Sequence, residues 1–109
     1  MTRLSTHILD TALGRPAGGV AVTVSVRKGD TWVVVGSGAT DEAGRVTDLL
    51  GKEPLEAATY RLTFGTAAYL GPNAFYPEVV VTFRVADPRE HHHIPLLLGP
   101  FGYTTYRGS

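Results

Sequence analysis

The sequence predicts an all-β protein with an antiparallel sandwich fold in a single domain. Its 109 residues suffice for one hydrophobic core but not for two, so one domain covering residues 1–109 is expected. Several short segments alternate apolar and polar residues with the two-residue period of half-buried strands. The 13 glycines and seven prolines fit frequent turns between these segments. Seven or eight short strands in this arrangement are typical of a sandwich.

The N-terminal half contains expected strands at residues 7–10, 20–27 and 31–36. In the second of these, Val20, Val22 and Val24 alternate with small or polar residues, which predicts one buried face. Lys28-Gly29-Asp30 is a turn sequence, so the second and third strands are predicted to form a hairpin. A second polar turn at residues 41–44 precedes a short segment at Arg45 and Val46.

The C-terminal half contains further expected strands at residues 58–64, 79–85, 92–98 and 103–106. Tyr60, Leu62 and Phe64 share one face of the first, as expected for a strand against a core. One short helix is expected at residues 66–70, because Gly71 and Pro72 would end it within two turns. Helix is therefore predicted to be a minor component.

The composition excludes several classes of function. Ten basic residues balance ten acidic ones, so no broad positive field is available to bind nucleic acid. No apolar run approaches the roughly 18 residues of a membrane span. The absence of cysteine removes disulfides, thiol nucleophiles and thiolate metal sites. The N-terminal residues show no secretory signal, so a cytoplasmic location is expected.

Three of the four histidines are consecutive, at His91, His92 and His93. On a strand, His91 and His93 point to one face, whereas His92 points with Ile94 toward the core. The same alternation groups His7 with Leu9. Solvated or core histidines are the simplest interpretation. A zinc site joining His7 to His91 or His93 is an alternative, although adjacent strand residues rarely converge on one ion.

Two other catalytic patterns are not supported by the sequence. The serines lie in no Gly-x-Ser-x-Gly elbow, so a Ser-His-Asp hydrolase is not predicted. The glycines around Ser37 are followed by neither Lys-Ser/Thr nor a helix, which argues against a phosphate-binding loop.

Three segments carry a resemblance to a known family: residues 4–17 (LSTHILDTALGRPA), 44–46 (GRV) and 91–109 (HHHIPLLLGPFGYTTYRGS). They closely resemble the 5-hydroxyisourate hydrolases, the transthyretin-related enzymes of purine catabolism. The terminal Tyr-Arg-Gly-Ser is that family's distinguishing signature. The resemblance implies a transthyretin-like sandwich of two four-stranded sheets with one short helix. It also implies a homotetramer whose active sites lie where dimers meet.

The activity implied by the resemblance is hydrolysis of 5-hydroxyisourate to 2-oxo-4-hydroxy-4-carboxy-5-ureidoimidazoline, without a metal or another cofactor. A histidine would activate water, and an arginine would stabilise the oxyanion. Which of the two site histidines activates water is left open. The Tyr106 hydroxyl would bind the substrate, and the Ser109 carboxylate would fix a catalytic histidine or arginine. The implied catalytic positions are His7, Arg45, His93 and Ser109, and the implied substrate-binding positions are His7, Arg45, Tyr106, Arg107 and Gly108.

Two positions depart from the family pattern. His92 and Gly99 stand where the family usually has tyrosine and serine. His92 is expected to add a titratable group next to the site. A transthyretin-like carrier of a hydrophobic hormone is the main alternative function, but such a carrier would lack the histidines and the Tyr-Arg-Gly-Ser ending. An adhesive or sugar-binding sandwich would require a leader and an exposed aromatic platform, and neither is evident.

Overall fold

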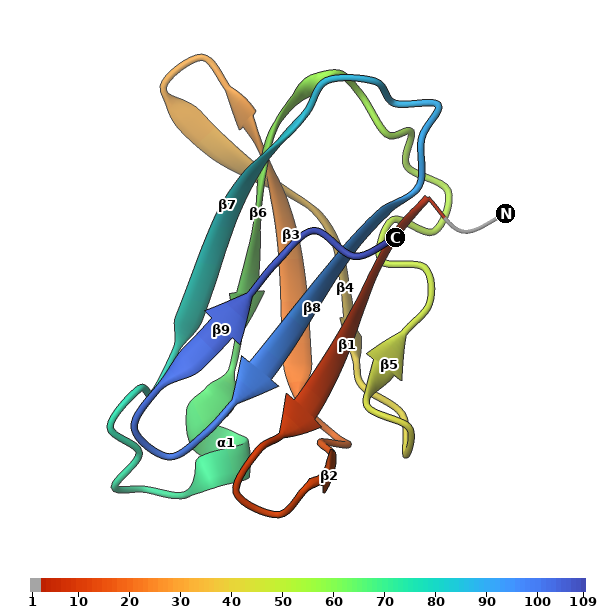
Figure 1. Ribbon diagram of the computed structural model, residues 1–109. Helices are drawn as coiled ribbons and strands as arrows, with labels where there is room; N and C mark the ends of the chain where they lie inside the picture. Colours follow the sequence, from red (N-terminus) through yellow and green to blue (C-terminus); the bar gives the residue numbers. More distant parts are fainter. Residues whose placement is uncertain (1–2) are drawn as a thin grey trace.

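Two β-sheets lie face to face in the computed structural model, which describes residues 3–109 (Figure 1). Met1 and Thr2, the start of the polar N-terminal segment, lie outside the described residues. The predicted sandwich with one short helix is confirmed. The elements in chain order are β1 Leu4–Asp10, β2 Arg15–Pro16, β3 Ala21–Lys28, β4 Thr31–Ala39, β5 Arg45–Val46, β6 Ala58–Phe64, α1 Thr66–Leu70, β7 Val79–Val85, β8 His92–Leu98 and β9 Tyr103–Thr105.

The first sheet has the strand order β2-β1-β8-β9, and β5 also pairs with β1. Five strands are present rather than the expected four, because the two-residue strands β2 and β5 both pair with β1. The expectation of wholly antiparallel pairing is wrong at one place: β1 and β8 run parallel over their full lengths. These two strands come from opposite ends of the chain, so no hairpin fixes their relative direction. Parallel and antiparallel strands show the same alternation of apolar residues, so the sequence pattern does not reveal the direction of β8 relative to β1.

The second sheet has the order β4-β3-β6-β7, and all its pairs are antiparallel. The predicted hairpin is confirmed as β3 and β4, although β4 continues to Ala39 rather than ending at Gly36. A register shift between Val24 and Ser25 interrupts this pair. β4 and β7 are the edge strands of this sheet, whereas β9 is an edge of the other sheet.

The core between the sheets is built from the faces that the alternation predicted. From the first sheet, Leu4, Ile8 and Leu96 are fully buried. Tyr60 and Phe64 of β6 are the largest fully buried side chains from the second sheet. Burial of this apolar surface is the main stabilising contribution to such a fold. The opposite faces of β1 and β8 are therefore free to carry other chemistry.

The short helix α1 anchors the end of β1. Tyr69 lies on α1 and donates its hydroxyl proton to Asp10 Oδ2 at 2.6 Å. The other Asp10 oxygen accepts hydrogen bonds from the backbone N–H groups of Ala12 and Leu13. Burial by itself would raise the pKa of Asp10, but these hydrogen bonds hold that pKa below its ordinary value. None of the helices within residues 3–109 has the length and apolar character needed to cross a membrane.

Candidate active site

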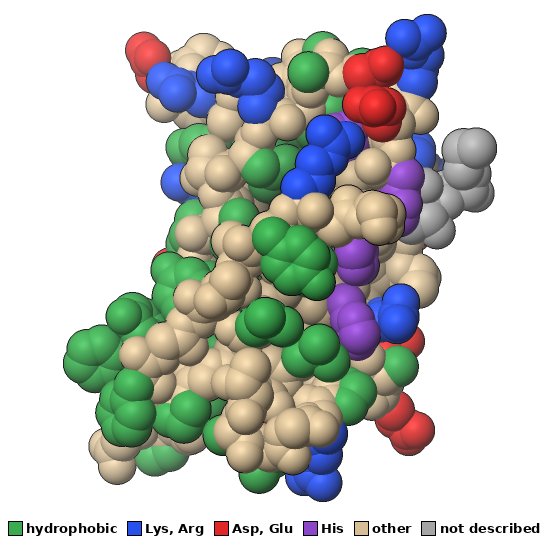
Figure 2. Space-filling model, in the orientation of Figure 1, with side chains coloured by type: hydrophobic (Ala, Val, Ile, Leu, Met, Phe, Trp, Pro, Cys, Tyr) green, Lys and Arg blue, Asp and Glu red, His purple; other side chains and the backbone are tan. Residues whose placement is uncertain are grey.

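Histidines gather on the outer face of the first sheet. Figure 2 shows their side chains together on the face where β1, β8 and β9 lie in front, with basic side chains nearby. The parallel register pairs Ser5 with His93 and His7 with Pro95, so these four residues point to the same side of the sheet. The predicted alternation, with His93 outward and His92 inward, is confirmed.

A cavity of about 240 Å³ opens on this face. Arg45, His93 and Ser109, which were all predicted as site residues, meet in its wall. This volume is below the roughly 300–1,000 Å³ of ordinary ligand sites. Among residues 3–109, the lining consists of Ser5, Thr6, Arg45, Val46, Thr47, His91, His93 and Ser109.

The environment of His93 disfavours protonation of its imidazole. Burial lowers the pKa of His93 below its ordinary 6.5, and nearby His91, His7 and Arg45 lower this pKa further. Its interaction with Ser5 acts in the opposite direction. The imidazole of His93 is therefore neutral at neutral pH and holds a lone pair that can accept a proton.

Ser5 is a functional candidate that the sequence reasoning missed. Its Oγ lies 2.9 Å from His91 Nε2 and 2.8 Å from His93 Nδ1, so one hydroxyl joins both rings. Ser5 is only 6% exposed, which keeps this hydroxyl away from bulk water. A signal was present, because Ser5 stands two positions before His7 on β1 and therefore shares its face.

Arg45 is positioned by the tight turn at residues 41–44. Asp41 Oδ1 accepts hydrogen bonds from the N–H groups of Ala43 and Arg45, each at 2.9 Å. Gly44 has a φ of 76°, and a Cβ there would lie 2.4 Å from the carbonyl oxygen of Ile8, so only glycine fits. The turn lets β5 pair with β1, where Arg45 is the register partner of His7.

The Arg45 side chain is exposed and makes no ion pair within residues 3–109. Its guanidinium remains able to bind an anionic or carbonyl oxygen entering the cavity. His7 is half-buried and does not line the cavity directly. It is close enough to contribute to the lowered pKa of His93.

The C-terminal tail closes one side of the cavity. The N–H of Gly108 donates to the carbonyl oxygen of His93 at 2.8 Å, and the two residues form an antiparallel bridge. A Cβ on Gly108 would lie 2.6 Å from His93 Cδ2, so any larger residue would displace the ring or the tail. This contact also brings Ser109 to the cavity wall.

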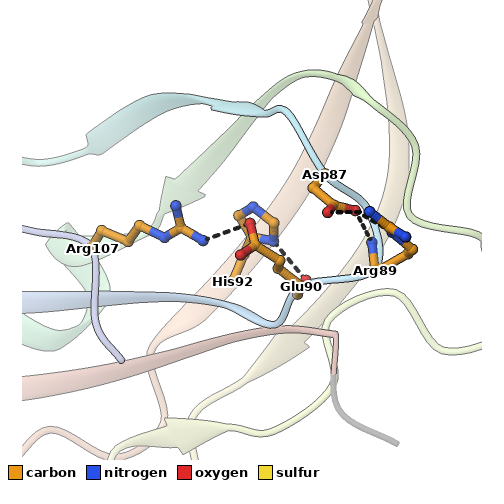
Figure 3. Close-up of polar contacts among 5 residues, drawn as sticks. All are labelled: Asp87, Arg89, Glu90, His92 and Arg107. Carbon is orange, nitrogen blue, oxygen red and sulfur yellow. Dashed lines mark hydrogen bonds and ion pairs between the residues drawn. The ribbon is translucent and has the colours of Figure 1, made fainter.

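Tyr106 and Arg107 are not brought into this cavity within one chain. They line a separate groove of about 210 Å³ between β7 and the C-terminal tail. Arg107 instead pairs with Glu90 at 3.5 Å (Figure 3). Their predicted roles in substrate binding stay predictions.

His92 lies on the opposite side of β8 from His93. It is 3% exposed, and its Nδ1 donates to the carbonyl oxygen of Glu90 at 2.9 Å, as Figure 3 shows. Strand alternation directs His92 away from the cavity that holds His93 and into the groove with Tyr106 and Arg107, so its expected place beside the site stays a prediction. At the other departure from the family pattern, a Cβ on Gly99 would lie 2.9 Å from Thr11 Oγ1.

The polar side chains of the cavity are imidazoles, hydroxyls and one guanidinium, and the Ser109 end of the chain also lies in its wall. Among the described residues, no three His, Asp or Glu side chains form a cluster suited to a metal ion. The ring centres of His91 and His93 are 6.1 Å apart, with Ser5 between their facing nitrogens. A neutral imidazole next to a fixed positive charge can remove a proton from water and stabilise an oxyanion.

Comparison with known proteins matches the chain to one family over nearly its whole length. The model of the HIUase/Transthyretin family matches residues 4–108. The chain is 40% identical over 109 residues to the 5-hydroxyisourate hydrolase of Salmonella dublin, covering 97% of this chain and 80% of that one.

Two solved structures are similar to this one to the same degree. The 5-hydroxyisourate hydrolase of Klebsiella pneumoniae has a TM-score of 0.84 and 36% identity, with all of both chains covered. Sea bream transthyretin, solved in complex with thyroxine, has a TM-score of 0.84 and 35% identity, covering 96% of this chain and 93% of that chain. The overall fold therefore does not separate the two kinds of protein, whereas the matching curated relatives, such as those of Salmonella dublin and Mus musculus, are named 5-hydroxyisourate hydrolases.

Proposed function

The chain belongs to the HIUase/Transthyretin family, as its sequence motifs predict, and we propose that it hydrolyses 5-hydroxyisourate to 2-oxo-4-hydroxy-4-carboxy-5-ureidoimidazoline. The observation that carries this proposal is the cavity in which a neutral His93 lies with Arg45 beneath the C-terminal tail. A carrier needs no proton acceptor in its binding site. Opening a cyclic amide with water needs both an acceptor for the water proton and a stabilised oxyanion.

In the proposed mechanism, His93 activates the water. Its Nδ1 is bound to the Ser5 hydroxyl, so Nε2 is the nitrogen left to accept the proton. The sequence left His7 and His93 equivalent in this role. The lowered pKa of His93 supports the assignment, because a base has to be unprotonated when substrate arrives.

Arg45 and His7 act on the substrate from the neighbouring strands. As water attacks, negative charge develops on the carbonyl oxygen, and the guanidinium of Arg45 stabilises it. His7 is the register partner of Arg45, and we assign it to orienting the substrate or the water from the same side. When the C–N bond breaks, the departing ring nitrogen receives a proton from an imidazole of the site.

The tail residues are assigned two different roles. Gly108 permits the close approach of the tail to His93, and Ser109 contributes to the cavity wall. Tyr106 is 54% exposed and, within residues 3–109, its hydroxyl makes no hydrogen bond to another side chain. We assign Tyr106 and Arg107 to substrate contacts that form only when a second copy of the chain completes the site.

A homotetramer with sites between dimers is part of this proposal. It is supported by the small, open cavity and by the edges of β7 and β9, which pair with no further strand within residues 3–109. Exposed strand edges readily pair with another chain. Large apolar side chains are also exposed, Phe75 and Phe101 among them. Sedimentation at micromolar concentration is expected to give a tetramer, and a stable monomer would contradict the assembly.

The location proposed from the sequence is the cytoplasm, in keeping with a fold that uses no disulfide. Cell fractionation tests it, and recovery of the protein outside the cytoplasm would contradict it.

The catalytic proposal is tested by generating 5-hydroxyisourate in solution from urate and following its decay. Addition of the folded protein is expected to accelerate this decay in proportion to protein concentration. The alternative of a carrier is favoured by the similarity to the transthyretin solved with thyroxine. If the protein does not accelerate the decay of 5-hydroxyisourate and binds thyroxine saturably, the hydrolase proposal is wrong and the protein is a carrier.

A further inference from the structure

The Ser5 hydroxyl connects the half-buried His93 to an exposed histidine. His93 Nδ1, Ser5 Oγ and His91 Nε2 form a continuous chain with separations of 2.8 and 2.9 Å. Ser5 itself is buried, whereas His91 is exposed at the mouth of the same cavity. Neutral imidazoles and hydroxyls both donate and accept hydrogen bonds, so every member of this chain can pass a proton on.

The environment of His93 creates a need for such a connection. When Nε2 takes the proton of the attacking water, His93 becomes a cation near the Arg45 guanidinium. Burial, His91, His7 and Arg45 all disfavour that cation. A base that is neutral on substrate arrival is therefore poorly suited to keep the proton that it takes.

We propose that His93, Ser5 and His91 form a proton relay through which His93 exchanges protons with solvent, and that Ser5 is the positioning residue that joins the two rings. This inference rests on the proposed hydrolysis of 5-hydroxyisourate. It adds His91 and Ser5, which the family motifs did not assign, to the working parts of the site.

The first half of the cycle exports a proton. At the start, His93 Nδ1–H donates to Ser5 Oγ, and Ser5 O–H donates to His91 Nε2. The water oxygen bonds to the substrate carbonyl carbon, and the water proton moves to His93 Nε2. The Nδ1 proton moves to Ser5, the Ser5 proton moves to His91 Nε2, and His91 Nδ1 loses its proton to solvent. His93 ends this half neutral, with its proton on Nε2.

The second half reverses the chain. The C–N bond breaks, the carbonyl re-forms, and the departing nitrogen takes the proton from His93 Nε2. Ser5 returns a proton to His93 Nδ1, His91 Nε2 returns one to Ser5, and His91 Nδ1 takes one from solvent. The sum is the addition of one water with no oxidation or reduction. One imidazole thus acts as base and then as acid without remaining charged.

The charged and titratable groups facing the relay belong to several elements. They are His7 on β1, Arg45 on β5, His91 ahead of β8, and the Ser109 end of the chain. None of the described residues in the cavity wall is an Asp or a Glu. The exposed end at His91 is consequently the place where a solvent base can exchange protons with the site.

Removal of His91 tests the outer end of the relay. In dilute non-nucleophilic buffer, His91→Ala is expected to lower kcat at least about tenfold, because proton exchange becomes limiting. Added imidazole should restore kcat of this variant in a concentration-dependent way and leave the wild type unaffected. The control is His92→Ala, which removes the adjacent histidine on the other face and should show no imidazole dependence. Wild-type kcat for His91→Ala in dilute buffer, or a low kcat that imidazole does not raise, would overturn the relay.

Removal of the Ser5 hydroxyl tests the middle of the relay. Ser5→Ala is expected to lower kcat about tenfold or more with little change in KM, and imidazole should not rescue it, because the break lies inside the protein. Ser5→Thr, which keeps a hydroxyl, should recover much of the loss. Ser25→Ala is the matched control, since Ser25 is 7% exposed and lies on β3 of the other sheet. Wild-type kcat for Ser5→Ala would contradict the proposal.

A measurement without substrate separates this inference from the proposed function. Imidazole nitrogen NMR of the wild type is expected to show linked titrations of His91 and His93, and Ser5→Ala should uncouple them. Unlinked titrations in an active wild-type enzyme would defeat the relay and leave the hydrolase intact. Linked titrations in a protein that does not accelerate 5-hydroxyisourate decay would defeat the proposed function instead.

Discussion

The two faces of β1 and β8 show how one pair of strands serves two purposes. On the inner face, Leu4, Ile8 and Leu96 are completely buried against the second sheet. On the outer face, Ser5 and His93 are register partners that hydrogen bond to each other and face a cavity. The strand alternation that builds the core therefore also delivers the polar groups of the site.

Stability and chemistry are therefore separable within these two strands. Inner residues should affect the free energy of unfolding without altering the chemistry of the folded protein. Substitutions on the outer face should change kcat with little effect on the free energy of unfolding. The side chains there are either less buried or hydrogen bonded mainly to one another.

The largest expected effect is on stability, from the inner face. Leu96→Ala should lower the free energy of unfolding by about 2–5 kcal/mol, through lost burial and the cavity left behind. Denaturant unfolding measures this change. The fraction that remains folded should keep nearly normal kcat. A large loss of kcat in fully folded Leu96→Ala protein would break the separation of the two faces.

On the outer face, a large effect on turnover is expected at Arg45. Arg45→Gln should lower kcat/KM about a hundredfold, a loss of about 2.7 kcal/mol of transition-state stabilisation, because the donor at the developing oxyanion is gone. The midpoint of denaturant unfolding should stay near that of the wild type, since Arg45 is exposed. Near-normal hydrolysis by the folded variant would remove Arg45 from the mechanism.

A smaller effect is expected where the tail contacts His93. Gly108→Ala places a Cβ 2.6 Å from His93 Cδ2, so the ring or the tail must shift. We expect kcat to fall about tenfold, because small displacements of a positioned base are costly. Gly102→Ala is the matched control, because a Cβ at Gly102 meets no atom within 4 Å. Unchanged kinetics in Gly108→Ala would show that the tail does not position His93.

The smallest expected effect is on the pH dependence of kcat/KM. Burial and the neighbouring positive groups keep the pKa of His93 below 6.5, so its base form persists at neutral pH and is lost only on acidification. The acid limb of kcat/KM should therefore have an apparent pKa below 6.5. Arg45→Gln should move the pKa of His93 upward, as NMR titration would show. An apparent pKa above 7 for the wild type would contradict this environment for His93.

The same lowered pKa has a consequence for stability. The folded state disfavours protonated His93, so below about pH 6.5 the unfolded chain binds more protons than the folded one. The contribution of His93 to unfolding free energy should therefore be constant at higher pH and become destabilising as the pH falls. His93→Gln should reduce this part of the acid sensitivity.

The sequence was sufficient for the features that depend on local pattern. Alternation placed His93 outward and His92 inward, and turn residues located the β3–β4 hairpin and the turn before Arg45. The parallel direction of β8 against β1 was not predictable, because it depends on how distant segments meet. Motif similarity indicated the family but did not specify side-chain contacts.

Contacts between distant segments also explain why the sequence did not identify Ser5 as part of the site. Ser5 could be assigned to the face of His7, but its contacts with His91 and His93 depend on the register of β1 against β8. Likewise, the signature at the end of the chain did not reveal that Gly108 reaches His93 while Arg107 pairs with Glu90. These contacts join segments that are distant in sequence, and no local pattern encodes them.

The most direct test of the central claim compares wild type and His93→Ala in the decay of 5-hydroxyisourate generated from urate, with folding of both verified by denaturant unfolding. If the outer face of β1 and β8 carries the chemistry, the wild type accelerates the decay, and the folded variant is slower by about a hundredfold or more. Equal rates for the two folded proteins would contradict the account.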